Sequence, residues 1–131
     1  MIVLLLTAMS LTATDFDTLD GAVQRCAKGE VSPVFAQQSE RQSQFMTEAY
    51  REQEAIVAER LDIADRRRAL REAGKAAPTT GDTVAALDLR AAAVEDRQRA
   101  LNDKRLLESL RSDAMDAKRR YYLAHCSGGK E

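Results

Sequence analysis

The chain has 131 residues, of which 31% are charged and 44% are hydrophobic, and its formal net charge at pH 7 is -1. This length suits one domain rather than two independent cores. The nearly balanced charge gives no overall attraction to nucleic acid or to an anionic membrane. Because Trp is absent, Pro occurs twice and helix-forming residues dominate, the composition predicts an all-α protein and argues against a β-sandwich.

The N-terminal segment 1–13 (MIVLLLTAMSLTA) is apolar and carries no charge. It is too short to cross a bilayer, which needs about 20 residues. An apolar run that ends in small residues is typical of a secretory signal peptide. We therefore expect cleavage near Ala13, one domain over 14–131, and a periplasmic or secreted protein with no membrane span. No Lys or Arg precedes the apolar run, so an uncleaved anchor and a buried N-terminal segment stay open as alternatives.

A short helix is predicted over 15–28. Thr14 can cap its N-terminus, and Gly29 can supply the left-handed residue that often ends a helix. The apolar residues of this segment recur at helical spacing, which predicts that the helix packs at the base of the longer elements.

Two long helices follow, over 33–73 and 82–125. Ser32-Pro33 is a favoured start because Ser caps the helix and Pro needs no amide donor in the first turn. Gly74 favours the end of the first long helix, and the segment 74–82, which contains Pro78, predicts a tip turn. Since the two helices match in length across one turn, the sequence predicts a long antiparallel hairpin.

The apolar pattern of the long helices predicts a shared seam. Ile56 is expected near Leu101, and Ile63 near Val94, because antiparallel pairing across the tip turn joins residues whose numbers sum to about 157, and these pairs are apolar on both sides. Met46, Tyr50 and Val57 are expected on the same buried face of the first long helix. In the second, a set of apolar residues is rotated away from the seam, which predicts a change of packing partner towards its C-terminus: Leu107, Leu110, Ala114, Ala117, Tyr121 and Ala124.

The two cysteines, Cys26 and Cys126, lie at similar distances from Pro78 along the chain. In an antiparallel hairpin this spacing brings them to the open end, which predicts a disulfide between them and suits an oxidising compartment. An intermolecular disulfide is one alternative. A metal or redox role that includes His125, the only histidine, is another.

Four arginines gather near the expected tip and form the candidate partner-binding residues: Arg66, Arg67, Arg68 and Arg71. The alternative is an ordinary solvated surface that is laced with acidic neighbours. Successive helical residues point 100° apart, so three consecutive arginines do not form one patch by themselves.

The sequence lacks the usual signatures of catalysis and cofactor binding. It has one histidine, no CxxC pair and no glycine-rich phosphate loop. We therefore expect no enzyme activity, no cofactor and no metal site. The function predicted is that of a non-enzymatic hairpin that binds other polypeptides, as an adaptor, assembly factor or chaperone-like module.

Two other interpretations follow from the same residues. Polar residues in the predicted seam leave it loose enough to admit a second copy of the hairpin, so a homo-oligomer is one expectation. The alternative function is a periplasmic sensor of oxidants or metals that uses Cys26, Cys126 and His125. No nucleic-acid partner is expected.

Overall fold

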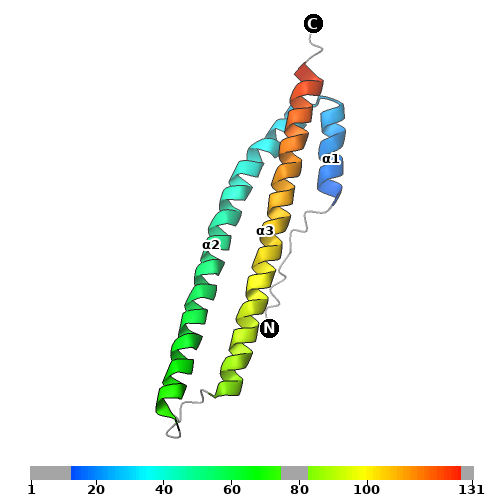
Figure 1. Cartoon of the computed structure of the whole chain (residues 1–131). Helices are drawn as coiled ribbons and strands as arrows, with labels where there is room; N and C mark the ends of the chain where they lie inside the picture. The colour runs from blue at the N-terminus through cyan, green and yellow to red at the C-terminus, as the bar shows by residue number, and fades with distance from the viewer. Residues whose placement is uncertain (1–12, 75–82, 128–131) are drawn as a thin grey trace, which may run out of the picture. The chain divides into compact units, whose positions relative to one another are not determined.

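The computed structural model describes residues 13–74 and 83–127, with side chains from residue 16 onward. Within these ranges the chain forms α1 (Ala13–Gln24), α2 (Lys28–Ala73) and α3 (Val84–Ser127) (Figure 1). The predicted all-α fold is confirmed: a short N-terminal helix accompanies two long helices that pack as a hairpin, and a disulfide joins Cys26 to Cys126. Residues 1–12 of the predicted signal peptide and most of the predicted tip turn lie outside the described residues.

The helices form two compact units. The first, which we name the α1 unit, comprises Met1–Glu40 and Ser112–Glu131, and the second, the hairpin unit, is Arg41–Arg111. Both long helices contribute to both units. No helix in the described part of the chain has an apolar stretch long enough to cross a membrane.

The core of the hairpin unit lies between α2 and α3. Ile56 and Ile63 of α2 cluster with Val94 and Leu101 of α3, as antiparallel pairing across the turn predicted. Ile56 has no exposed surface, and Ala49 and Ala91 pack against the same cluster. The seam is narrow because each helix contributes one apolar residue per two turns.

The predicted change of face along α3 is wrong within the hairpin unit. Leu107 and Leu110 are 67% and 55% exposed, whereas Glu108 is only 7% exposed. The seven-residue repeat continues along α3 without a shift, so the residue that follows Leu101 in the seam is Glu108. The buried positions share this spacing: Leu87, Val94, Leu101, Glu108 and Met115.

The core of the α1 unit joins all three helices. Leu19 and Val23 of α1 cluster with Val31 of α2 and Met115 of α3. Phe35 and Tyr122 pack at the edge of this cluster, with their ring centroids 6.1 Å apart. The prediction that α1 packs against the ends of both long helices is therefore confirmed.

The connection between α1 and α2 differs from the prediction. We expected α1 to reach residue 28 and Gly29 to be left-handed, but α1 ends at Gln24 and the left-handed residue is Cys26, with φ 51°. The Cys26 amide donates to the Val23 carbonyl and the Ala27 amide to the Ala22 carbonyl, both at 3.0 Å. These two bonds form a Schellman motif, which ends the helix earlier than the glycine would.

The start of α2 also differs, because Pro33 lies inside the helix and not at its first position. Val31 has no exposed surface, and its amide donates to the Ala27 carbonyl at 3.0 Å. Burial of Val31 in the core therefore requires helix from Lys28 onward. The cost is one helical hydrogen bond, since Pro33 has no amide to offer the Gly29 carbonyl.

The other ends of the long helices follow local signals. Gly74 has φ 54°, and its amide donates to the Leu70 carbonyl at 3.2 Å, so α2 stops where predicted. At the start of α3, the Thr83 hydroxyl accepts from the Ala86 amide at 3.0 Å. Thr83 is thus the N-cap, and α3 begins at Val84, two residues after the predicted start.

Candidate functional site

One face of α2 in the hairpin unit carries large apolar side chains that no other part of the described chain covers. We name it the α2 stripe: Met46, Tyr50, Val57 and Leu61, which are 45% to 66% exposed. They are separated by four, seven and four residues. At 100° per residue, these spacings place all four within about 60° of one another. The prediction that three of them are buried in the seam is wrong.

The position of the α2 stripe follows from the width of the seam. Ile56 is fully buried against α3, and Val57 is the next residue, so its side chain points about 100° away. A single partner helix covers only one such face. The remaining apolar residues of α2 are therefore left for water or for another partner.

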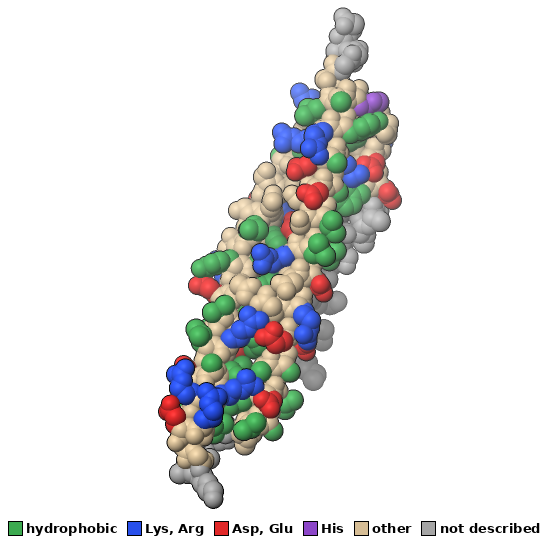
Figure 2. Space-filling view, in the orientation of Figure 1, with side chains coloured by type: hydrophobic (Ala, Val, Ile, Leu, Met, Phe, Trp, Pro, Cys, Tyr) green, Lys and Arg blue, Asp and Glu red, His purple; other side chains and the backbone are tan. Residues whose placement is uncertain are grey.

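Further apolar residues are exposed on α3 in the hairpin unit. Leu89 and Leu106 are 74% and 59% exposed, and Leu107 and Leu110 are exposed as reported above. Figure 2 shows hydrophobic side chains scattered among charged ones over the visible face. Because Leu89 lies 17 residues from Leu106, these leucines do not form one stripe comparable to that of α2.

Three of the four candidate arginines are engaged in ion pairs within the hairpin unit. Arg66 Nε lies 2.8 Å from Asp62 Oδ2, and Arg68 pairs with Asp65 on the same helix. Arg67 reaches across to Asp88 of α3 at 2.7 Å. Their guanidinium groups point to different neighbours, and no ion pair links Arg71 to another of the described residues. The four residues are close in sequence, but the structure does not bring them together as one site.

Ion pairs also link the two long helices along the seam. Arg90 Nη2 lies 2.7 Å from both Glu59 and Asp62, and Arg97 pairs with Glu52 at 2.9 Å. Hydrogen bonds from Arg90 and then Arg66 lower the pKa of Asp62, and a hydrogen bond from Arg97 lowers that of Glu52. These carboxylates therefore stay ionised at neutral pH, as structural ion pairs do, and do not act as proton donors.

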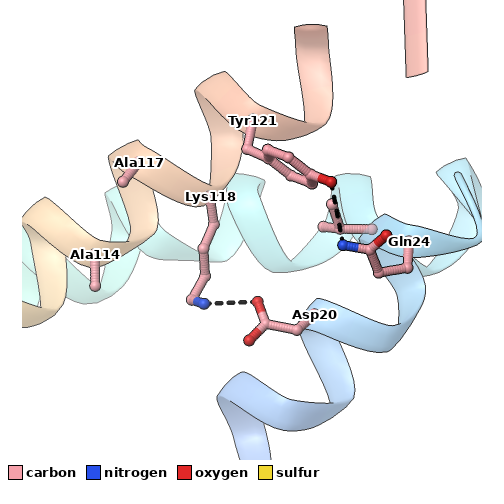
Figure 3. A pocket seen from close by; sticks show the side chains of 7 residues that line it. Asp20, Gln24, Ala114, Ala117, Lys118 and Tyr121 are labelled. Carbon is pink, nitrogen blue, oxygen red and sulfur yellow. Dashed lines mark hydrogen bonds and ion pairs between the residues drawn. The ribbon is translucent and has the colours of Figure 1, made fainter. Parts of the chain in front are cut away.

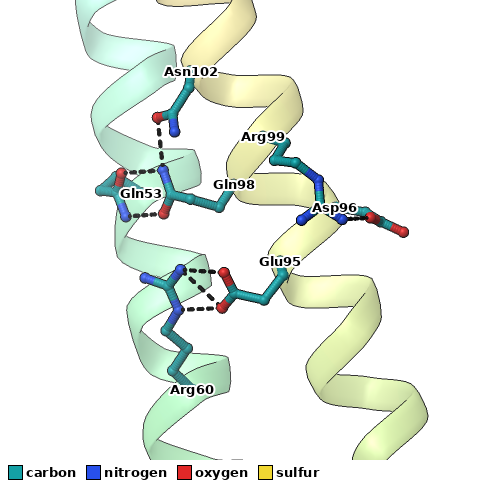
Figure 4. Close-up of polar contacts among 7 residues, drawn as sticks. All are labelled: Gln53, Arg60, Glu95, Asp96, Gln98, Arg99 and Asn102. Atoms are coloured by element: carbon teal, nitrogen blue, oxygen red, sulfur yellow. Dashed lines mark hydrogen bonds and ion pairs between the residues drawn. The ribbon is translucent and has the colours of Figure 1, made fainter.

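Amide groups complete the seam of the hairpin unit. Gln53 and Gln98 exchange two hydrogen bonds of 2.8 and 3.0 Å, and Gln98 also donates to Asn102 (Figure 4). Two turns further along α2 from Gln53, Arg60 forms a bidentate contact with Glu95. These polar contacts fix the register of α2 against α3 and leave little of the polar seam free for a ligand.

A shallow cavity lies between α1 and α3 in the α1 unit (Figure 3). It measures about 490 Å³ and owes its space to Ala114 and Ala117, whose short side chains leave room beside α1. Lys118 bonds to Asp20 at 2.6 Å, and Gln24 donates to the Tyr121 hydroxyl at 3.2 Å. Both bridges connect the two helices, so the polar groups of the cavity are already used.

The cysteine site is in the same unit. The Cα atoms of Cys26 and Cys126 are 5.5 Å apart, and the structure records no free cysteine. His125 lies beside the disulfide: its ring stacks on Tyr121 with centroids 5.2 Å apart, and Nε2 is 3.5 Å from the Gln24 carbonyl oxygen. The predicted disulfide is confirmed, and the histidine that the sensor hypothesis required is next to it.

A scan against protein-family models found no match, and neither did searches of the curated proteins and of the solved structures. The candidate sites are therefore judged on their own chemistry. Sequence reasoning missed the α2 stripe, although its signal was present. The four-seven-four spacing of Met46, Tyr50, Val57 and Leu61 defines a second apolar face beside that of Ile56 and Ile63.

Proposed function

We propose that the protein is a non-enzymatic polypeptide binder whose α2 stripe receives an amphipathic helix of another chain. The carrying observation is the exposure of Met46, Tyr50, Val57 and Leu61 on one helical face. Exposed apolar side chains are costly in water when they gather, and such patches mark interaction sites. Anchors that recur at helical spacing are the pattern used when one helix docks along another.

The charges beside the stripe favour a basic partner. At 100° per residue, Glu54 and Asp65 lie along one edge of the α2 stripe, but Asp65 is already paired with Arg68, so Glu54 is the acidic group that this edge offers. Arg60, near the opposite edge, is already paired with Glu95. A partner helix with leucines facing the stripe and a lysine opposite Glu54 would therefore match both the apolar residues and this carboxylate.

A defined peptide tests this proposal. The probe is a helical peptide with leucines separated by four, seven and four residues and lysines at the flanking positions. The variant Met46→Gln/Tyr50→Gln/Val57→Gln/Leu61→Gln removes the apolar anchors while keeping good helix formers. We expect the peptide to bind the unaltered protein saturably and the variant at least about tenfold more weakly, a loss of about 1.4 kcal/mol.

The matched control is Leu89→Gln/Leu106→Gln, which removes two exposed leucines from α3. It should change the peptide affinity by less than about threefold. Equal loss in the control, or no saturable binding at all, would count against the proposal. Sedimentation of the unaltered protein and of both variants tests whether the α2 stripe instead binds a second copy of this chain. A dimer that only the four-residue variant abolishes would identify the second copy as the occupant.

We further propose that the protein works in the periplasm or outside the cell. The apolar segment 1–13 and the Cys26–Cys126 disulfide both support an oxidising destination. Intact-mass measurement of the protein from its native host, alkylated with and without prior reduction, tests this. We expect loss of the N-terminus near Ala13 and two alkylated thiols only after reduction. A retained leader with two free thiols would contradict it.

A further inference from the structure

Three metal-binding side chains converge at one place in the α1 unit. The ligand atoms of Cys26, His125 and Cys126 all lie within 4.8 Å of one another. They come from two segments that are about 100 residues apart in sequence. Cys26 occupies the left-handed turn after α1, whereas His125 and Cys126 lie in the last turn of α3.

The chemistry of this set changes with the redox state. As a disulfide, the two sulfurs have no thiolate to offer. After reduction they become two thiols beside an imidazole, and thiolate with imidazole is the ligand set preferred by zinc and related ions. Three protein ligands leave one tetrahedral position for water. Cys26 and His125 are both exposed, so a reductant and a metal ion have access to the site.

We propose that, when the disulfide is reduced, Cys26, Cys126 and His125 bind one Zn²⁺ ion. A dithiol reductant supplies two electrons and two protons, which break the S–S bond and leave two thiols, while the reductant itself becomes a disulfide. Zinc binding then releases the two thiol protons and forms two Zn–S bonds and one Zn–N bond. This inference is independent of the α2 stripe and of the proposed polypeptide partner.

Neighbouring groups support the histidine as a ligand. Nε2 lies 3.5 Å from the Gln24 carbonyl oxygen, which can accept a hydrogen bond from Nε2–H and so leaves Nδ1 for the metal. The Tyr121 ring stacks on the imidazole and limits its rotation. Bound zinc would also replace the disulfide as the crosslink between the turn after α1 and the end of α3, so these two segments would stay linked under reducing conditions.

The experiment uses the full chain, reduced with a phosphine under anaerobic conditions, and Co²⁺ as the spectroscopic probe. We expect one Co²⁺ per chain, thiolate-to-cobalt charge-transfer bands and ligand-field bands of tetrahedral intensity, all displaced by Zn²⁺. The oxidised protein should show none of these bands. His125→Ala should weaken Zn²⁺ binding by about tenfold or more, with the ligand-field bands shifted.

Two further variants make the result decisive. Cys26→Ser leaves Cys126 as the one thiolate ligand, so it should weaken Zn²⁺ binding and lower the intensity of the thiolate-to-cobalt bands, whereas Arg119→Ala, on an exposed part of α3, should leave Zn²⁺ affinity unchanged. Circular dichroism of the reduced, metal-free chain checks that the helices persist. Absence of tetrahedral bands in the folded, reduced protein would overturn the proposal. So would equal Zn²⁺ affinity in His125→Ala and the unaltered chain.

Discussion

Arg41 of α2 donates a hydrogen bond to Glu108 of α3, with Nη2 and Oε2 3.1 Å apart, at a seam position where α3 otherwise places Leu, Val or Met. The two partners differ in exposure: the side chain of Glu108 is 9% exposed and that of Arg41 is 40% exposed. Glu108 Oε1 has no hydrogen-bond partner among the residues that the structure describes. The pair therefore places a buried carboxylate in an apolar seam with a hydrogen bond to only one of its two oxygens. The contact with Arg41 helps to fix the register of α2 against α3.

The asymmetry of this pair predicts different effects for its two members. Arg41→Leu leaves Glu108 buried without its partner, so we expect the free energy of unfolding to fall by about 2 kcal/mol. Glu108→Leu restores the seven-residue pattern and leaves Arg41 with access to water. We expect it to be neutral or to stabilise by up to about 1 kcal/mol. Urea unfolding of both variants measures the difference, and the reverse order of stabilities would contradict this account.

The disulfide closes a loop with a sequence separation of 100. Replacement of both cysteines by serine frees the unfolded chain, and the chain-entropy model gives an upper figure of about 4.7 kcal/mol for a loop of this size. We expect a loss of about 3 kcal/mol, because the α1 core of Leu19, Val23 and Met115 remains. Denaturation of the oxidised and doubly substituted chains checks this, and equal midpoints would show that the crosslink adds nothing.

Cys26 offers a separate test of its backbone conformation. A left-handed residue other than glycine carries a steric cost of about 1 kcal/mol. In a chain with Cys126→Ser, we therefore expect Cys26→Gly to be more stable than Cys26→Ser by up to about 1 kcal/mol. Thermal unfolding of these two double variants measures the backbone effect without the disulfide. A more stable serine variant would argue against the Schellman turn.

Acid should lower the stability of the hairpin unit, because the carboxylates whose pKa values are lowered by ion pairs become protonated. Asp62 and Glu52 titrate below their ordinary values of 3.8 and 4.5, because Arg90 and Arg97 donate hydrogen bonds to them. A carboxylate with a lowered folded-state pKa stabilises the fold above its unfolded pKa and loses that contribution as pH falls through the folded value.

We therefore expect a constant melting temperature near neutral pH and a decline that begins below about pH 4.5. Asp62→Asn should make this decline shallower. Asp103→Asn, at a carboxylate for which the structure records no ion pair, is the control and should follow the unaltered protein. Melting curves across this range test both, and parallel curves for Asp62→Asn and the unaltered protein would count against the ion-pair explanation.

Sequence reasoning succeeded where a repeating pattern determined the structure. Ile56, Ile63, Val94 and Leu101 were assigned to one seam because antiparallel pairing across the turn places them opposite one another, and the structure clusters them. It failed where tertiary packing overrode a strong local signal. Gly29 and Pro33 both suggest a break, yet the burial of Val31 requires continuous helix across them.

The seam of α3 shows a second source of error. Leu107 and Leu110 were assigned to a rotated, partner-facing side of the helix because hydrophobicity alone favours leucine at buried positions. The seven-residue repeat, and the arginine that meets Glu108 from α2, decided otherwise. The α2 stripe was missed for a related reason. Its residues were assigned to the same broad apolar face as the seam residues, and that face is wider than a single partner helix can cover.

The most direct test of the binding function is position-specific photocrosslinking in the native host. A benzophenone amino acid is placed at Tyr50, within the α2 stripe, or at Arg51, which is exposed about 100° away on the same helix. The account predicts a discrete crosslink to a different polypeptide from position 50 and none from position 51. No adduct at position 50, equal adducts at both positions, or an adduct of two copies of this chain would contradict it.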